Sequence, residues 1–234
     1  MNILALDASS GVASVALLSD DVIVGEYTIN HKKTHSQTLM PMINQLLASI
    51  DFDISEIDTF AASVGPGSFT GLRIGLATIK GLAHACDRQV VGVSTLEAMA
   101  YNLPCCDKMI VPILDARRDQ VYGGVYRWKD EELLTIIEPC ALSIDELLAI
   151  IQTKGEPAIF IGDGVVRFKG QIEDKLATNA EFTFANSNLQ RAASVAVLAN
   201  KKFQNGEGVS CEKMKPIYLR KSQAEREYDE KKQT

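Results

Sequence analysis

The sequence contains one pattern of predicted elements twice, once in each half. The first apolar strand ends in Leu6-Asp7-Ala8, and a strand of the same kind in the second half ends in Leu114-Asp115-Ala116. After each of them a polar turn leads into a second strand, and a further strand, a helix, another strand and a late helix follow. We therefore predict an α/β chain of two related lobes, residues 1–105 and 106–220, followed by a charged tail at 221–234 that is flexible or ordered by a partner.

Hydrophobic periodicity defines the predicted elements of each half. Leu39, Ile43, Leu46 and Ile50, for example, recur at helical spacing. In the first half we predict strands at 3–8, 12–17, 22–29, 59–64 and 90–93, and helices at 36–50, 69–85 and 95–101. In the second half we predict strands at 109–115, 121–128, 133–137, 158–161 and 182–184, and helices at 143–152 and 189–203.

Composition and charge exclude several classes of protein. The chain is 46% hydrophobic and 23% charged, which is typical of a folded globular protein. Its apolar runs, such as residues 109–114, are far shorter than the ~18 residues that a membrane-spanning helix requires. The formal net charge of -6, without a basic stripe, argues against direct, independent binding of nucleic acids.

The N-terminus and the cysteines indicate a cytoplasmic protein. The chain begins without a basic segment and has an acid at Asp7, so we predict no secretory signal. Its five cysteines are an odd number without metal-site spacing, which favours free thiols in a reducing compartment.

Residues 63–75 carry the most information about function. A predicted strand enters Gly65-Pro66-Gly67-Ser68 and a helix follows, so the backbone N–H groups at the helix start form a candidate anion site. No Gly-Lys-Ser/Thr triplet follows, however, and the glycine spacing differs from that of the dinucleotide-binding motif. A tight turn shaped by the glycines is the simpler interpretation, with anion binding as the alternative.

The helix after this turn has small residues along one face. Gly71, Gly75, Thr78, Gly81 and Ala85 form that stripe. Because a glycine inside a helix costs about 1 kcal/mol relative to alanine, we expect a close contact along the stripe. The contact is either with another helix of the same lobe or with a second chain. In the second case the stripe and the apolar face of the preceding helix form one interface.

Other candidates for chemistry are sparse. Asp7 and Asp115 each end the first strand of their half, where a carboxylate suits either a magnesium ion or a local turn. Gly162 and Gly164 flank Asp163 after a strand and suit either a nucleotide or a turn. The three histidines support neither a metal site nor a catalytic triad.

Four segments together are diagnostic. They are Ile-Leu-Ala-Leu-Asp-Ala-Ser at residues 3–9, His35-Ser36-Gln37-x-Leu39-x-Pro41, the run from Gly65 to Gly75, and Leu114-Asp115-Ala116-Arg117-Arg118-x-x-Val121-Tyr122. With these segments, which lie within residues 1–128, the sequence resembles the bacterial TsaB (YeaZ) family. The resemblance implies an ASKHA fold, the actin-like and Hsp70-like pair of duplicated ribonuclease H-like lobes, in agreement with the repeated pattern.

The resemblance also implies a function. Members of this family take part in making N6-threonylcarbamoyladenosine at position 37 of tRNAs that read codons beginning with adenosine. TsaB is the non-catalytic partner of its paralogue TsaD, with the ATPase TsaE as the third component, and a TsaB homodimer is a further option. The resemblance thus implies that this chain has no cofactor of its own, and that ATP, magnesium and the catalytic metal belong to partner subunits.

One position supports this division of labour. In TsaD-like proteins two histidines after the equivalent strand hold the catalytic metal, whereas Thr95 and Met99 stand in that register here. Neither a hydroxyl nor a thioether replaces imidazole at such a site. The residues that we assign to a surface shared with TsaD or with a second copy are His35, Ser36, Leu39, Met42, Leu46, Gly71, Gly75 and Thr78, with Arg73 at its edge.

Two alternatives stand beside this scaffold or activating role. The first is a small-molecule kinase or ATPase of the same fold, with Asp7 as the magnesium ligand and the segment from Gly162 to Gly164 at the nucleotide. ATP binding or hydrolysis that is lost in Asp7→Ala would favour it. The second, a peptidase, lacks both a metal site and a nucleophile with its base.

Overall fold

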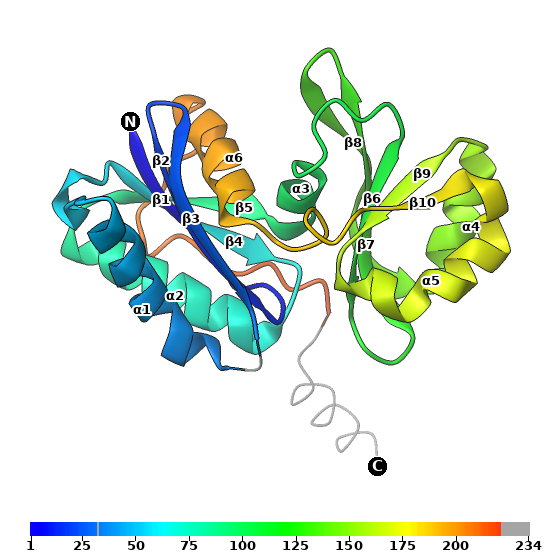
Figure 1. Cartoon of the computed structure of the whole chain (residues 1–234), viewed down its shortest axis with the longest axis horizontal. Helices are drawn as coiled ribbons and strands as arrows, with labels where there is room; N and C mark the ends of the chain where they lie inside the picture. The colour runs from blue at the N-terminus through cyan, green and yellow to red at the C-terminus, as the bar shows by residue number, and fades with distance from the viewer. Residues whose placement is uncertain (32, 221–234) are drawn as a thin grey trace.

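The computed structural model describes residues 1–31 and 33–220, and the predicted tail at 221–234 lies outside that range. Two lobes lie side by side, each built on one mixed sheet of five strands (Figure 1). In the described part of the chain, every helix is too short or too polar to cross a membrane.

The first lobe has the strand order β3-β2-β1-β4-β5. Its strands are β1 (Asn2–Asp7), β2 (Val12–Ser19), β3 (Val22–Asn30), β4 (Thr59–Gly65) and β5 (Gln89–Ser94), with a short 3-10 helix at Ile54–Glu56. β2 runs antiparallel to β1 and β3, whereas β1, β4 and β5 are parallel. Helices α1 (His35–Ser49) and α2 (Phe69–Ala85) cover one face of this sheet, and α3 (Thr95–Ala100) and α6 (Ala192–Gln204) pack on the other.

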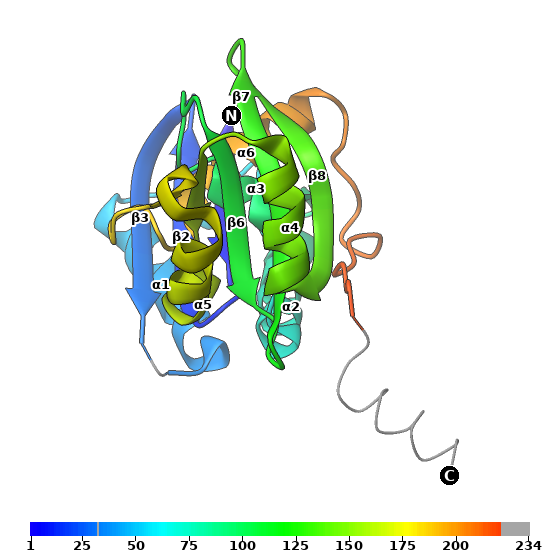
Figure 2. The same cartoon turned by 90° about the vertical axis from the view of Figure 1, so that its right-hand side faces the viewer.

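The second lobe repeats this arrangement in the order β10-β9-β6-β7-β8. Its strands are β6 (Met109–Asp115), β7 (Gln120–Lys129), β8 (Glu132–Ser143), β9 (Ala158–Ile161) and β10 (Ala180–Phe182), with a 3-10 helix at Ala177–Asn179. Helices α4 (Ile144–Lys154) and α5 (Asp163–Leu176) lie on one face of its sheet (Figure 2). Because β6 to β10 follow the order and directions of β1 to β5, the predicted duplication and the ASKHA fold are confirmed.

Side-chain caps explain where two helices begin. Ser143 forms a capping box with Glu146 at the start of α4, and Gly155 ends that helix with a φ of 66°. Ser68 accepts a hydrogen bond from the Gly71 backbone N–H at the start of α2. These contacts satisfy N–H groups that the first turn of a helix leaves unpaired.

Helix α5 is missing from our sequence-based prediction, which considers the segment from Gly162 to Gly164 either as a nucleotide site or as a turn. In the structure Gly162 is the N-cap, and Asp163 begins the helix. The buried face consists of Val165, Phe168, Ile172 and Leu176. Their helical spacing was a usable signal, which the glycine-rich start concealed. Strand β10 likewise begins two residues before the predicted one.

The chain returns to the first lobe near its C-terminus, which corrects the predicted boundary. Val195, Leu198 and Ala199 of α6 pack against Ile3 and Ala5 of β1. The first sheet has a second apolar face that must be covered, and α6 covers it. The second lobe therefore ends before α6 rather than at residue 220.

The two lobes meet through α3. Leu96 and Met99 form one buried cluster with Leu114 and Tyr126 of the second sheet. Just beyond the helix, Asn102 Nδ2 donates a hydrogen bond of 2.8 Å to the Leu189 carbonyl oxygen. The contact between the lobes is thus a small apolar core with hydrogen bonds beside it.

Candidate protein interface

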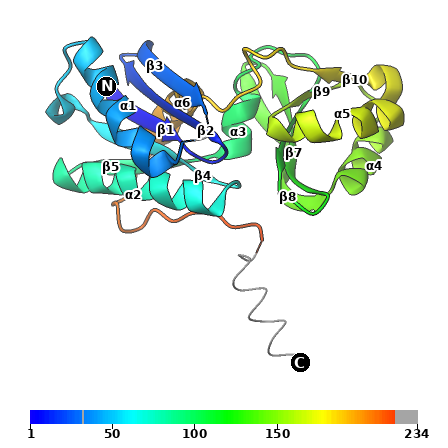
Figure 3. The ribbon, with the colours of Figure 1, turned by 60° about the horizontal axis from the view of Figure 1, so that its bottom comes forward.

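Helices α1 and α2 lie side by side on the first sheet (Figure 3). Their inner faces place Leu39, Ile43, Leu46, Leu76 and Ile79 in the core of that lobe. Their other faces point away from the sheet. Every residue that the sequence assigned to an interface lies on these two helices, so the question is which face each one occupies.

Three of the assigned side chains belong to the lobe's own core. Leu39, Met42 and Leu46 are only 1%, 6% and 2% exposed. The helical period of 3.6 residues puts them on the inner face of α1 together with Ile43. Their assignment to a surface is therefore corrected: these side chains hold α1 on the sheet.

The small-residue stripe of α2 is divided between two faces. A Cβ atom on Gly71 would lie 2.1 Å from the carbonyl oxygen of Ala8, and one on Gly75 would lie 3.0 Å from Leu6 Cδ1. These two glycines leave room for atoms of their own lobe. The hypothesis that the small residues make room for a second chain is therefore wrong for Gly71 and Gly75. Gly81 differs, because no atom lies within 4 Å of its Cβ position.

The remaining assigned residues, His35, Ser36, Arg73 and Thr78, are at least partly exposed. His35 Nε2 lies 2.8 Å from the carbonyl oxygen of Ser10 and so joins the start of α1 to the turn after β1. All four side chains border the exposed side of the helix pair. Their role in an interface stays a prediction.

The exposed side of this helix pair carries little charge. Within the two helices, Arg73 and Lys80 are the only members of the Asp, Glu, Lys and Arg set. Lys80 is half-buried and donates a hydrogen bond to the Met214 carbonyl oxygen. The exposed residues, which we call the outer face, are Ser36, Gln37, Met40, Pro41, Asn44, Gln45, Ala48, Ser49, Thr70, Arg73, Ala77, Gly81, His84 and Ala85.

The corresponding helices of the second lobe are different. Their exposed charged residues are Asp145, Glu146, Lys154, Asp163, Arg167, Lys169, Glu173, Asp174 and Lys175. Lys169 and Glu173 form an ion pair of 3.8 Å one helical turn apart. Such a face is typical of contact with water, whereas depletion of charge is typical of the centre of a protein interface.

An apolar groove of about 280 Å³ lies at one end of the outer face, where β3 ends and α1 begins. It is lined by Ile29, His31, Lys33, Gln37, Thr38, Pro41 and Met42. The groove extends the outer face toward the edge of the first sheet and adds basic side chains to its rim.

Sequence reasoning missed two aromatic residues beside Arg73. The rings of Phe69 and Tyr218 are stacked with centroids 4.1 Å apart, and Arg73 Nε donates a hydrogen bond of 3.0 Å to the Tyr218 hydroxyl. The Arg73 guanidinium also lies 4.0 Å from the centre of the Phe69 ring. Tyr218 is 145 residues away from Arg73 in the chain, so no spacing in the sequence indicates this contact.

Asp7, the magnesium ligand of the kinase hypothesis, is only 1% exposed. Its carboxylate accepts hydrogen bonds from the backbone N–H and the hydroxyl of Ser9, at 2.8 and 2.6 Å, and from the Ser63 hydroxyl. Burial raises the pKa of the Asp7 carboxyl, and the hydrogen bonds from Ser63 and Ser9 oppose that rise. Of the two roles considered for Asp7, a magnesium ligand and a residue that holds a local turn, these hydrogen bonds match the second.

The two glycines of the same hypothesis also have structural contacts. A Cβ atom on Gly162 would lie 2.3 Å from the Ile113 carbonyl oxygen and 2.7 Å from Met99 Cε, and one on Gly164 would lie 3.0 Å from the same oxygen. The start of α5 therefore packs directly against β6 and α3. Both glycines permit this close approach of the backbone.

Thr95 and Met99, which stand in the register of the TsaD metal ligands, are 0% and 1% exposed. Met99 lies in the cluster that joins the lobes, beside Leu114 and Ile161. Across residues 1–31 and 33–220, no three His, Cys, Asp or Glu side chains are grouped so that they could hold a metal ion.

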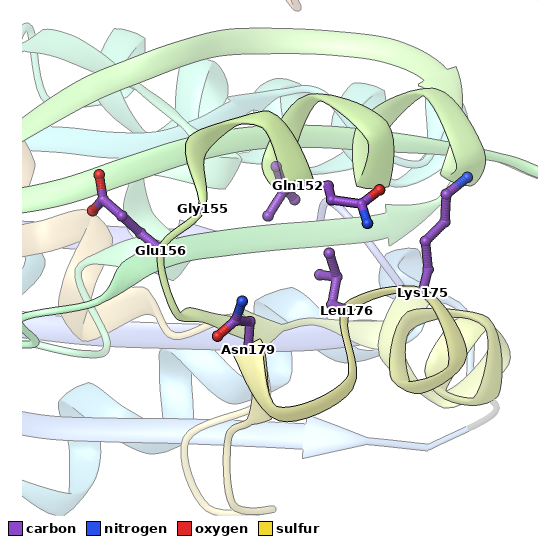
Figure 4. Close-up of a pocket in the computed structure, with 7 residues that line it drawn as sticks. Gln152, Gly155, Glu156, Lys175, Leu176 and Asn179 are labelled. Atoms are coloured by element: carbon purple, nitrogen blue, oxygen red, sulfur yellow. The ribbon is translucent and has the colours of Figure 1, made fainter.

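A small hollow lies in the second lobe between the C-terminal ends of α4 and α5 (Figure 4). Its lining residues are Ile151, Gln152, Gly155, Glu156, Lys175, Leu176 and Asn179. Its volume of about 60 Å³ corresponds to on the order of two water molecules. The hollow is therefore too small for a nucleotide, and it lies in the other lobe from the outer face.

A family model and individual relatives of this chain have descriptions that all concern threonylcarbamoyl modification of tRNA. The family model described as "TsaD: tRNA N6-adenosine threonylcarbamoyltransferase" matches residues 22–228. The tRNA threonylcarbamoyladenosine biosynthesis protein TsaB of Bacillus subtilis is 34% identical over 98% of this chain and 99% of its own length. The protein of the same description from Escherichia coli is 29% identical over 96% of both chains.

Solved structures agree with the sequence comparison. The structure of YeaZ from Pseudomonas aeruginosa superposes with a TM-score of 0.78 at 28% sequence identity. The match covers 93% of this chain and 99% of that structure. Both lobes are therefore shared, and the likeness extends over nearly the whole chain.

Proposed function

The chain belongs to the TsaB (YeaZ) family of tRNA threonylcarbamoyladenosine biosynthesis proteins, and from this premise we propose that it is a non-catalytic subunit of the threonylcarbamoyl transferase complex. Its role is to bind the catalytic subunit TsaD through the outer face and to activate it. The product of the complex is N6-threonylcarbamoyladenosine in tRNA.

The observation that carries this proposal is the contrast between two equivalent helix layers. The outer face of α1 and α2 has Arg73 as its one exposed member of the Asp, Glu, Lys and Arg set, whereas α5 exposes charges along its length and α4 exposes them at both of its ends. A surface with few charges costs less free energy to remove from water than a charged one when another protein covers it. Small residues such as Ala77 and Gly81 let a partner helix approach closely.

The residues in the register of the TsaD ligands support a non-catalytic role. Met99 is buried between the lobes and Thr95 is fully buried, so neither side chain lines an accessible site. Their side chains do not fit a catalytic divalent ion. The metal, ATP and magnesium that the reaction uses are accordingly assigned to TsaD and TsaE.

The same surface accounts for the other proposed partners. A second copy of this chain competes with TsaD for the outer face, so homodimer and heterodimer exclude each other there. TsaE joins as the third component, and tRNA is held by another subunit of the complex. We place the assembled complex in the cytoplasm.

To test this proposal, one positive charge is introduced on each of the two helix layers, and the effects on TsaD binding are compared. Ala77→Arg puts a guanidinium on the outer face, and Gln171→Arg puts the same group on exposed α5 as the matched control. Affinity for purified TsaD is measured by titration calorimetry, and threonylcarbamoylation of tRNA is measured with TsaD and TsaE. We expect Ala77→Arg to weaken binding at least about thirtyfold, because an unpaired charge in a dry contact costs about 2 kcal/mol or more.

The control defines the contrary outcome. Gln171→Arg is expected to leave both TsaD binding and tRNA modification unchanged. Equal affinity of the two variants for TsaD would contradict the interface, and full modification activity without this chain would contradict the activating role.

A further inference from the structure

The segment after α6 crosses the edge of the first sheet. This segment, residues 207–220, is called the strap below. Val209 pairs with Val90 of β5 through two backbone hydrogen bonds of 2.9 and 3.0 Å. Because β5 is the edge strand, the strap passes at this point from the α6 side of the sheet to the α2 side.

The strap then follows α2 back toward the start of that helix (Figure 3). Met214 is buried in the core of the first lobe at 4% exposure, and its carbonyl oxygen accepts the hydrogen bond from Lys80 Nζ. Further on, the Ile217 backbone N–H donates a hydrogen bond of 2.7 Å to the Val64 carbonyl oxygen at the end of β4. Both contacts bind the strap to the first lobe.

The end of the strap touches both lobes. Tyr218 stacks on Phe69 and accepts the hydrogen bond from Arg73, all at the N-terminal end of α2. Two residues later, Arg220 Nη1 donates a hydrogen bond of 3.0 Å to the carbonyl oxygen of Ala116 in the second lobe. The strap therefore links the start of α2 to the turn between β6 and β7.

That turn has an unusual backbone. Arg117, Arg118 and Asp119 have φ values of 61°, 54° and 58°, in a region that residues other than glycine rarely adopt. Ala116 and Gln120 close the turn, with the Ala116 N–H donating to the Gln120 carbonyl oxygen at 2.9 Å. A conformation of this kind persists only where surrounding contacts hold it, and the strap supplies one of them.

We propose that the strap is a conformational tie between the lobes, in which Tyr218 and Arg220 couple the N-terminal end of α2 to the β6–β7 turn. The tie lies on the α2 side of the molecule, whereas the α3 contact joins the lobes on the other side of the first sheet. The tie forms within this chain and involves no partner, so its effects are measured on the chain alone.

Hydrogen exchange of the full chain tests the tie. In Arg220→Ala the hydrogen bond to Ala116 is lost, and we expect amide exchange in residues 116–120 to become roughly fivefold faster. Tyr218→Ala is expected to do the same, because Arg220 depends on the stacked ring for its position. Lys215→Ala removes an exposed charge from the same strap and serves as the matched control, with unchanged exchange.

The location of the effect decides the outcome. Faster exchange that is confined to residues 116–120 in both variants supports the tie. If Arg220→Ala leaves these residues unchanged, or if Tyr218→Ala affects only the start of α2, the strap belongs to the first lobe alone and the proposal is wrong. An equal acceleration throughout α4 and α5 would indicate general destabilisation and would also overturn it.

Discussion

The two helix layers of this molecule share a position in the fold and differ in what they present to the outside. The inner sides of α1 and α2 and of α4 and α5 are equally apolar, as Leu46 at 2% and Leu147 at 0% exposure illustrate. The outer sides diverge, because the second layer exposes charges and the first exposes small, amide and thioether side chains. A duplicated fold thus determines where a helix lies, and the residues on its free side determine what it contacts.

The same contrast separates two uses of glycine in α2. Gly71 and Gly75 are required by neighbours within the lobe, whereas Gly81 lies free on the outer face. Helix α5 repeats the distinction, since Gly164 packs against Ile113 and Gly170 has no atom within 4 Å of its Cβ position. Residue type alone does not distinguish an internal contact from an external one.

The largest expected effect tests whether the inner faces are truly alike. Leu46→Ala and Leu147→Ala each remove a buried side chain, and each is expected to lower the free energy of unfolding by about 2–5 kcal/mol. Met40→Ala, at an exposed position of α1, is the control and should change it by less than about 0.5 kcal/mol. Urea titration measures all three. If Leu46→Ala lowered the free energy of unfolding only slightly, the assignment of Leu46 to the core would be contradicted and its assignment to the interface would be favoured.

The next effect distinguishes the glycines. Gly71→Ala forces a methyl group against the Ala8 carbonyl oxygen and should cost about 1–3 kcal/mol of unfolding free energy. Gly170→Ala, in the open face of α5, should instead stabilise the chain by about 0.5–1 kcal/mol. Thermal unfolding of the two variants should therefore shift in opposite directions, and shifts of the same sign would contradict the assignment of Gly71 to an internal contact.

A smaller effect compares the carboxylates that end β1 and β6. Burial raises the pKa of Asp7 above that of the unfolded chain, so the folded state holds its proton more tightly. The stability of the wild type relative to Asp7→Asn should then fall as pH rises from about 4, and level off above the pKa of the folded state. Urea midpoints over this range provide the measurement, and a difference that is independent of pH would be inconsistent with the burial of this group.

Asp115, at the equivalent place in the second lobe, is exposed and pairs with Arg167 at 3.1 Å. Asp115→Asn removes an ion pair that water screens. At neutral pH it is expected to change the free energy of unfolding by less than about 1 kcal/mol.

The smallest effect concerns the charged side of α5. Glu173→Gln breaks the exposed pair with Lys169 and should cost no more than about 0.5 kcal/mol, with no effect on TsaD binding. Calorimetry of unfolding and of binding checks both statements. A measurable loss of TsaD affinity would show that the second layer also contributes to the interface.

Much of the fold was predictable because its signals are local. The restart at Leu114-Asp115-Ala116, the alternation of strands and the capping box at Ser143 depend on neighbours within a few residues. Helix α5 was missed although Phe168 and Ile172 carry its period, since glycines at its start resemble a turn. The residue pattern and the resemblance together indicated α1 and α2 as the helices of the interface. The sequence-based prediction nevertheless placed Leu39 and Gly71 on the outward side of these helices, whereas both face the inside of the lobe.

The sequence by itself determined the order of elements apart from helix α5, the duplication, the family and the lack of metal-binding side chains in the register of Thr95 and Met99. Only the tertiary structure decided which lobe α6 covers, which glycines face inward, and that Tyr218 stacks on Phe69 beside Arg73. The physical reason is the distance along the chain between the residues that interact. Periodicity and capping are set by adjacent residues, whereas burial and the path of the strap depend on groups that the chain brings together from distant positions.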